Sequence, residues 1–259
     1  MQRIFVGIPV LNRFDLLDKA IEALDYESIE LFIVNNNTVD AANTEAFHKL
    51  KDKYKFDSYS PRFNLGVAAS WNHILATAWS RNYDFIYMGS NDTFLHPGTL
   101  RTLVEMEKPE IECLWLASWF HFWCMRLSAI PKIGLFDENF MPAYYEDNDC
   151  LRRIQQAGLQ VVHMREHAFE MNGRMVPGVG AVALHSQTIN SDPEYAALNY
   201  HTFHENQNYY LRKWGGQPEY ETFANPFNDP NNTVNRWPDP NNIAAKRDWD
   251  NNRRSARSN

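Results

Sequence analysis

Short apolar runs alternate with longer amphipathic stretches through residues 4–92 of the chain. Residues 4–10, 31–34, 56–59 and 85–88 have the length and composition of buried strands, whereas apolar residues at three- and four-residue spacing over 16–24 predict one face of a helix. The same pattern predicts further helices over 41–54 and 67–79. This order predicts an α/β fold with a mostly parallel central sheet and helices on both of its faces.

Polar residues follow the ends of three of these predicted strands. They are Asn12 and Arg13, the turn over 35–38, and the stretch over 90–92. Ligands of open α/β sheets collect beyond the carboxyl ends of the strands. We therefore expect these three segments to meet in one crevice.

The pattern changes after residue 112. Long aromatic runs over 114–125 suit strands that face both core and cleft, whereas the chain after 192 is rich in Asn, Pro and Tyr and poor in aliphatic residues. We expect a catalytic domain over 1–190, an arm or lid over 191–242, and a basic tail over 243–259 whose composition is compatible with disorder.

Three carboxylates stand where an aromatic segment turns into a helix. Glu146, Asp147 and Asp149 precede apolar residues at three-residue spacing, and Gly158 offers a helix stop. The helix dipole favours the ionised form of acids at this end. Such a carboxylate can accept a proton from an attacking hydroxyl or hold a polar substrate. The alternative is an acidic N-terminal cap of an ordinary helix.

Composition limits the classes of partner. A net charge of −7 gives no global attraction to nucleic acid, although a local basic surface remains open. Cys113, Cys124 and Cys150 lack metal-ligand spacing and are expected to be buried thiols in a reducing compartment. No segment has the apolar length of a membrane span, so we expect a soluble, cytoplasmic protein.

Several segments together resemble the family 2 type of GT-A glycosyltransferase, over about residues 4–188. They are 7–13, 32–40, 64–66 with Asn72, 87–92 with Pro97, and 133–153. The resemblance implies a GT-A fold with a C-terminal arm. It also implies that the nucleotide of a nucleoside-diphosphate sugar is bound by Pro9, Leu11, Asn12, Arg13, Asn35, Asn36, Asn64, Gly66, Asn72, Ser90 and Asn91.

The segment 87–92 stands where that family carries its metal motif. The resemblance implies that Asp92 binds a divalent cation, Mn or Mg, which neutralises the diphosphate as it leaves. His185 stands where many relatives have a histidine that helps to bind the metal or the diphosphate. Ser90 replaces the first acid of the motif, a departure that could weaken metal affinity or leave binding to water and phosphate.

The resemblance also implies the catalytic residues. Asp147 would be the base that deprotonates the acceptor hydroxyl, and Glu146 is the alternative base. Asp149 would hold the loop and cap the helix, with Trp119 and Tyr145 supporting the acceptor or the loop. The stretch with Arg212, Lys213 and Trp214 resembles the ending of phage-encoded and bacterial proteins of this type and could close over the diphosphate or sugar as a lid; interdomain packing is the alternative.

The expected activity is inverting transfer of a sugar to a hydroxyl acceptor. A UDP-sugar is the favoured donor, but Asn35 replaces the usual Asp of the base-binding turn and leaves another nucleotide open. The acceptor would be a glycan or lipid-linked sugar, with a virion protein or a hydroxylated DNA base as alternatives for a phage-encoded enzyme in host cytoplasm. The tail could hold a phosphate backbone or be a solvated end. A different class of function is a non-catalytic nucleotide- or sugar-binding module with this fold.

Overall fold

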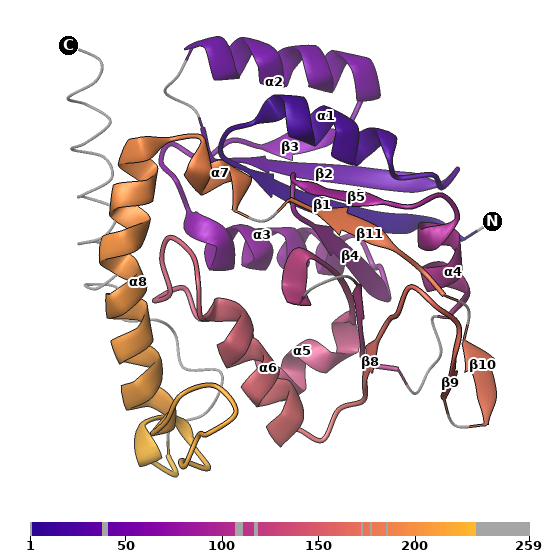
Figure 1. Ribbon diagram of the computed structural model, residues 1–259. Helices are drawn as coiled ribbons and strands as arrows, with labels where there is room; N and C mark the ends of the chain where they lie inside the picture. Colours follow the sequence, from indigo (N-terminus) through magenta and orange to yellow (C-terminus); the bar gives the residue numbers. More distant parts are fainter. Residues whose placement is uncertain are drawn as a thin grey trace.

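The computed structural model describes residues 2–37, 41–106, 111–116, 119–171, 173–176, 178–184 and 186–231. Within these residues a seven-stranded sheet has the order β3-β2-β1-β4-β7-β6-β8 (Figure 1). The strands are β1 (Ile4–Val10), β2 (Ile29–Asn35), β3 (Asp57–Tyr59), β4 (Phe85–Gly89), β6 (Cys113–Leu116), β7 (Phe122–Arg126) and β8 (Val161–His163). The sheet confirms the predicted α/β class.

Parallel pairing covers the half of the sheet built from the first four strands. β1 pairs in parallel with β2 and with β4, and β2 pairs in parallel with β3. β7 runs antiparallel to both β4 and β6, and β8 is parallel to β6. The sheet is therefore mostly parallel, as predicted, with one strand inserted in the opposite direction.

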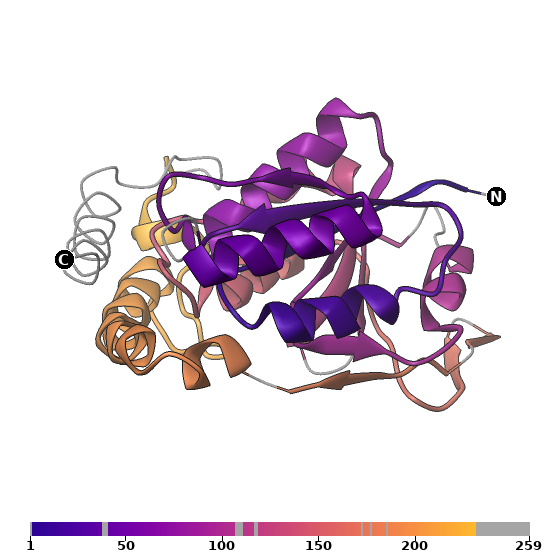
Figure 2. The same ribbon diagram turned by 90° about the horizontal axis from the view of Figure 1, so that it is seen from above.

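Helices cover both faces of this sheet (Figure 2). One face carries α1 (Phe14–Glu22), α2 (Ala41–Tyr54) and α4 (Thr99–Glu105), and the other carries α3 (Gly66–Ser80), α5 (Ile130–Ile133) and α6 (Glu146–Gln156). Side chains alternate along β1, so that Ile4, Val6 and Ile8 join the first core and Phe5 joins the second. Gly7 lets α3 approach β1 closely, because a Cβ there would lie 2.1 Å from Ile74 Cγ2.

The segment expected as an arm or lid contains a long helix, α8 (Pro193–Trp214), preceded by α7 (Gln187–Asn190). The side chain of Asp192 accepts hydrogen bonds from the backbone N–H groups of Glu194 and Tyr195, and Pro193 occupies the first turn. Gly215 ends the helix at φ 74° in the left-handed region. Local capping signals therefore define both ends of α8.

Smaller elements complete the described chain. β5 (Thr93–Leu95) pairs with β11 (Ala181–Ala183), and β9 (Phe169–Met171) pairs with β10 (Arg174–Val176), both antiparallel. Three 3-10 turns are η1 (Trp119–His121), η2 (Leu127–Ala129) and η3 (Pro226–Asn228). The cysteines at 113, 124 and 150 are buried free thiols, as predicted. No helix among the described residues has the length and apolar character needed to cross a membrane.

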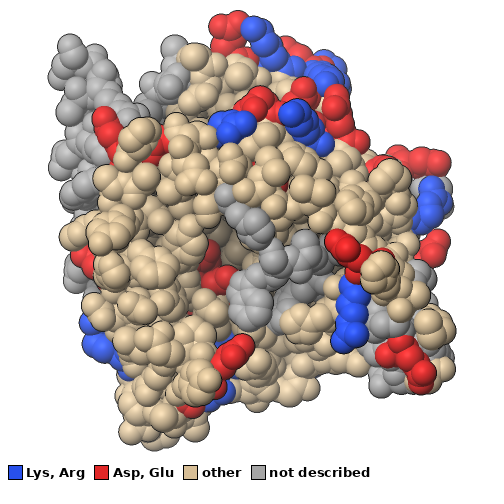
Figure 3. Space-filling view, in the orientation of Figure 1, with Lys and Arg blue, Asp and Glu red and all other residues tan. Residues whose placement is uncertain are grey.

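Charged side chains on the face shown in Figure 3 gather over α1 and α2, where basic and acidic groups are mixed. Lys53 forms ion pairs with Asp18 and Glu22, and Arg13 pairs with Asp15. These pairs balance the charge locally, so the basic groups over α1 and α2 do not form a continuous positive patch.

Candidate active site

A cavity of about 370 Å³ lies at the carboxyl ends of the central parallel strands. Residues 9–11 at the end of β1, Asn36 after β2, and residues 89–92 after β4 line one side of it. The three strand ends meet because β1 lies between β2 and β4 in the sheet. The cavity lies where the crevice was expected, and of the polar residues used for that prediction Asn36 and residues 90–92 line it.

The first turns of α3 and α6 line the same cavity. Asn64 and Gly66 come from the start of α3, and Glu146 and Asp147 come from the start of α6. Asp92 and Asp147 are therefore on the walls of one cavity. The expectation that these two acids face one cavity is therefore compatible with the structure, and their roles stay predictions.

Asp92 is held by its neighbours. Ser90 Oγ donates a hydrogen bond to Asp92 Oδ1 at 2.8 Å, and the backbone N–H of Gln187 donates to Asp92 Oδ2 at 3.2 Å. The carboxylate is buried, with 5% of the residue exposed. Asn91 supports the same turn, because its amide donates to the carbonyl oxygen of Asn12 at 3.0 Å. The turn after β4 thus presents one acid in a restrained orientation.

Glu146 and Asp147 have different environments although they are neighbours. Glu146 is buried, with 5% exposed, and among the described residues its Oε2 has no hydrogen-bond partner. Burial, together with the charge of Asp147, raises the pKa of Glu146 well above its ordinary value. Asp147 is half-buried, and its Oδ1 accepts a hydrogen bond from the Asn148 backbone N–H at 2.8 Å. Glu146 is therefore favoured in the neutral form.

The start of α3 is fixed by amide side chains. Asn36 Oδ1 accepts from the Leu65 N–H at 3.0 Å, and Asn36 Nδ2 donates to Ser70 Oγ at 2.9 Å. Asn64 Oδ1 accepts from the Gly66 N–H at 2.9 Å. Gly66 has φ 76°, and a Cβ there would lie 2.8 Å from Pro142 O. The glycine is required where α3 meets the wall that precedes α6.

Four residues predicted to bind the nucleotide are not among the lining residues of the cavity: Asn12, Arg13, Asn35 and Asn72. The Asn72 amide is used internally, since it donates to Phe136 O at 2.9 Å and accepts from the Phe136 N–H at 2.8 Å. Asn35 accepts from the Asn37 N–H at 3.0 Å. Tertiary packing thus engages the Asn72 amide, whereas the Asn35 amide oxygen is engaged in a local turn.

Arg13 and Asn12 lie beside the cavity and join β1 to α7. The guanidinium of Arg13 forms hydrogen bonds to Asp15 at 2.8 Å and to Ser191 Oγ at 3.2 Å. Asn12 Nδ2 donates to Thr188 O at 2.9 Å. Both side chains hold the edge of the site together and do not form its described walls.

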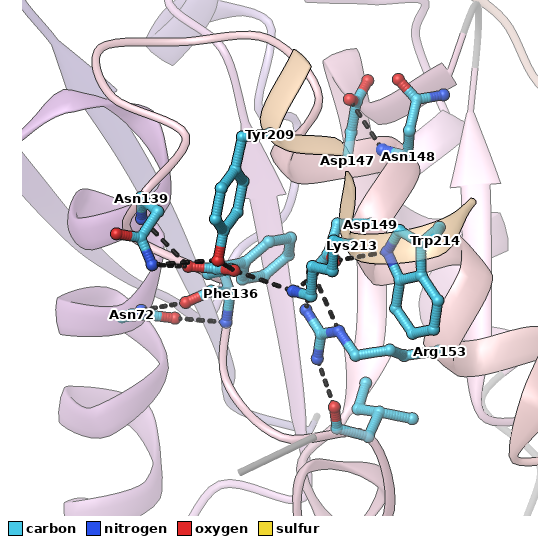
Figure 4. A network of polar contacts seen from close by, with 12 residues as sticks. Asn72, Phe136, Asn139, Asp147, Asn148, Asp149, Arg153, Tyr209, Lys213 and Trp214 are labelled. Atoms are coloured by element: carbon cyan, nitrogen blue, oxygen red, sulfur yellow. Dashed lines mark hydrogen bonds and ion pairs between the residues drawn. The ribbon is translucent and has the colours of Figure 1, made fainter. Parts of the chain in front are cut away.

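The residues predicted as a lid are not placed over the cavity. Lys213 and Trp214 are buried at the end of α8, and Arg212 is exposed beside Tyr209. Lys213 Nζ lies 2.8 Å from Asp137 Oδ2 and 2.6 Å from Asp149 Oδ1 (Figure 4). The packing alternative therefore describes Lys213 and Trp214, because their polar groups contact buried carboxylates.

Asp149 holds its segment but does not cap the helix. The residue before the first turn of α6 is Tyr145, at φ 73° and without a side-chain cap, and it packs against Tyr210 in the core. Asp149 accepts from Trp214 Nε1 at 2.9 Å and from Arg153 Nε at 3.0 Å (Figure 4). Asp149 thus forms a buried hydrogen bond to α8 in place of the expected helix cap.

Two predicted positions carry no structural account. His185 lies outside the described residues, and of Trp119 only its backbone position at the start of η1 is described. Their proposed roles stay predictions.

Some residues of the cavity wall were not predicted from the sequence. They come from η1, from the segment before α6, and from α7 and α8: Phe120, His121, Ala143, Tyr144, Ser186, Thr188, Ile189 and Tyr195. Tyr144 had one available signal, because it is an aromatic residue just before the predicted helix start at Glu146. The others are recognisable only once the chain has folded.

Acids dominate the charge of the cavity. Its described lining includes the carboxyl groups of Asp92, Glu146 and Asp147 but no Lys or Arg. Among the described residues no cluster of three or more His, Cys, Asp or Glu side chains forms a ready metal site.

The sheet, the helical layers and the cavity at the strand ends define the class of fold. It is the GT-A fold of the glycosyltransferases that use nucleotide-sugars, as the neighbouring solved structures establish.

The particular neighbours are distant in sequence. The mannosyltransferase PcManGT from Pyrobaculum calidifontis, in complex with GDP-Man and Mn²⁺, superposes with a TM-score of 0.55 at 13% identity, covering 85% of this chain and 67% of that one. TarS 1–349 from S. aureus in complex with UDP gives 0.52 at 11%, covering 85% and 74%. GalNAc-T7 with UDP, GalNAc and Mn²⁺ gives 0.56 at 9%, covering 82% and 50%. The sequence itself matches no protein-family model and no curated protein.

Proposed function

We propose that this protein is an inverting glycosyltransferase that moves a sugar from a nucleoside-diphosphate sugar to a hydroxyl acceptor. The observation that carries the proposal is the shared cavity of Asp92 and Asp147 at the strand ends of a GT-A fold. Solved neighbours of this fold were crystallised with GDP-Man or UDP, which makes these nucleotides the first donors to test. The acceptor hydroxyl would approach from the side of α6, opposite the diphosphate.

Asp147 is the stronger candidate for the base. A base must be ionised before the reaction, and Asp147 lies in the first turn of α6, where the helix dipole favours a negative charge. Burial raises the pKa of Glu146 and favours its protonated form, which can donate a hydrogen bond but cannot accept the proton of the acceptor. Asp147 would thus act as the base, and Glu146 would act as a hydrogen-bond donor.

A divalent cation fits the acidic cavity. Magnesium sites at phosphates commonly use one or two carboxylates and complete their shell with phosphate oxygens and water. Asp92 supplies one restrained carboxylate, and no basic side chain is among the described lining residues to neutralise a diphosphate. When bound, the ion would stabilise negative charge on the leaving diphosphate. Asp92 would hold it, and Ser90 would orient that carboxylate.

The test is a screen of UDP-, GDP- and dTDP-sugars for hydrolysis and transfer, with Mn²⁺, Mg²⁺ or chelator. We expect turnover only with a divalent ion. In Asp147→Asn, turnover should fall by about 10²- to 10⁴-fold while the donor still raises the melting temperature. Asp18→Asn, on α1 and outside the cavity lining, is the control and should keep full turnover.

Equal rates for Asp147→Asn and wild type would refute the assigned base. Tight donor binding without any turnover in wild type would favour a binding module.

A further inference from the structure

The wall that carries Glu146 and Asp147 is attached from behind to α8. Residues two apart on a helix point in directions about 200° apart, so Asp149 faces away from the side that Asp147 presents to the cavity. Asp149 is fully buried and contacts Lys213 and Trp214 near the end of α8. The first turn of α6 therefore lies between the cavity and the C-terminal end of α8.

The loop before α6 is tied to the same helix. Lys213 Nζ also binds Asp137 Oδ2 at 2.8 Å, and Tyr209 OH donates to the same oxygen at 2.9 Å. Asn206 is fully buried and its amide donates to Ala143 O at 2.9 Å, next to the cavity. Two parts of the wall, its loop and its helix start, thus share α8 as a support.

Charge balance shows that Lys213 is needed in this place. The buried network contains two acids, Asp137 and Asp149, and two cations, Arg153 and Lys213 (Figure 4). Burial raises the pKa of Asp137, but the Lys213 ammonium and nearby hydrogen bonds outweigh this effect and lower it to about 2. Asp137 is therefore ionised, and Lys213 is the cation that bridges it to Asp149.

We propose that Lys213 is a positioning residue for the reaction, acting through Asp137 and Asp149 to hold the wall from which Asp147 meets the acceptor. The inference rests on the proposed function and adds to it a residue of α8 outside the cavity. A small displacement of a catalytic group can cost about a hundredfold in rate, so a support of this kind affects turnover more than donor binding. The donor contacts at the ends of β1 and β4 do not depend on it.

The experiment compares Lys213→Met, which keeps the length of the side chain but removes its charge, with the double variant Lys213→Met/Asp137→Asn, which restores charge balance. We expect Lys213→Met to lower both the melting temperature and kcat, the latter by about tenfold or more per folded molecule, with the donor KM unchanged. The double variant should have a higher melting temperature than Lys213→Met but the same low kcat, because Asp149 still lacks the contact with the Lys213 ammonium. Lys213→Arg, which keeps the charge, should regain part of kcat.

A matched control separates positioning from stability. Phe47→Leu lies in the core under α2, on the opposite face of the sheet, and should lower the melting temperature with kcat unchanged. If kcat instead follows melting temperature across all these variants, or if folded Lys213→Met has wild-type kcat, the positioning role is wrong.

Hydrogen exchange gives a readout that does not depend on activity. Lys213→Met should speed amide exchange over 134–149 and leave 4–35 protected, whereas uniform exchange across the chain would overturn the inference. If wild type transfers no sugar from any donor, the proposed function fails, and the exchange pattern still decides whether Lys213 holds the wall.

Discussion

Removal of the Arg153 guanidinium should destabilise the protein strongly, because it leaves buried negative charge in excess. Arg153 is 2% exposed, and its Nε and Nη2 lie 3.0 and 2.9 Å from Asp149 Oδ2, while Nη1 donates to Ile133 O. Breaking a buried ion pair by removing one partner costs about 3–5 kcal/mol. Lys213 remains 2.6 Å from the other oxygen of Asp149, so we expect Arg153→Met to cost about 3 kcal/mol, the lower end of that range.

Thermal and denaturant unfolding at neutral pH measure this loss. For a domain of this size, each kcal/mol shifts the melting temperature by about 2–4 °C, so a drop of about 6–12 °C is expected. Arg153→Met/Asp149→Asn removes one charge of each sign and keeps an oxygen for Trp214 Nε1, so it should be more stable than Arg153→Met alone. A loss below about 1 kcal/mol, or costs that simply add in the double variant, would show that charge imbalance is not the cause.

Three further predictions follow from single positions. Gly66→Ala should cost more stability than Gly98→Ala, by about 1–3 kcal/mol in denaturant unfolding, because both glycines have positive φ but only the first would place a Cβ 2.8 Å from Pro142 O; equal losses would exclude the clash. Ser90→Asp should lower the Mn²⁺ concentration that gives half-maximal turnover, since it adds a second acid to the metal motif, and a higher requirement would contradict the metal assignment. Burial raises the pKa of Glu146 above its ordinary 4.5, so the folded state keeps a proton that the unfolded chain releases, and stability is lost as pH rises from 4.5 towards the folded-state pKa. Glu146→Gln should remove this loss in melts run at increasing pH, and an unchanged pH dependence would place the titration elsewhere.

The parallel half of the fold and the centre of the site were predictable from the sequence. Strand-length apolar runs that end in polar residues located the ends of β1, β2 and β4, because buried parallel strands read as continuous apolar segments. The turn from an aromatic segment into a helix located Glu146 and Asp147. Both signals are local, so one sequence is enough to read them.

The remaining features depend on contacts between distant parts of the chain. Nothing local specifies that β7 is inserted antiparallel beside β4, or that the Asn72 amide is used by the backbone of Phe136. Lys213 and Trp214 have the composition of a phosphate or sugar contact, and only their burial against acids shows otherwise. α8 is a different case, since Asp192 and Gly215 are readable caps that its Asn- and Tyr-rich composition obscured.

The position of β1 and β4 has a consequence for how the site can change. Both strands lie in the interior of the sheet and have hydrogen-bonded neighbours on each side. The floor of the cavity can therefore open only if the sheet itself unfolds. The opposite wall is a loop and one helical turn supported by a peripheral helix. Under the proposed function, substitutions in that wall would alter which acceptor is admitted while the donor side stays intact, so that an engineer or natural selection could vary the two halves of the reaction separately.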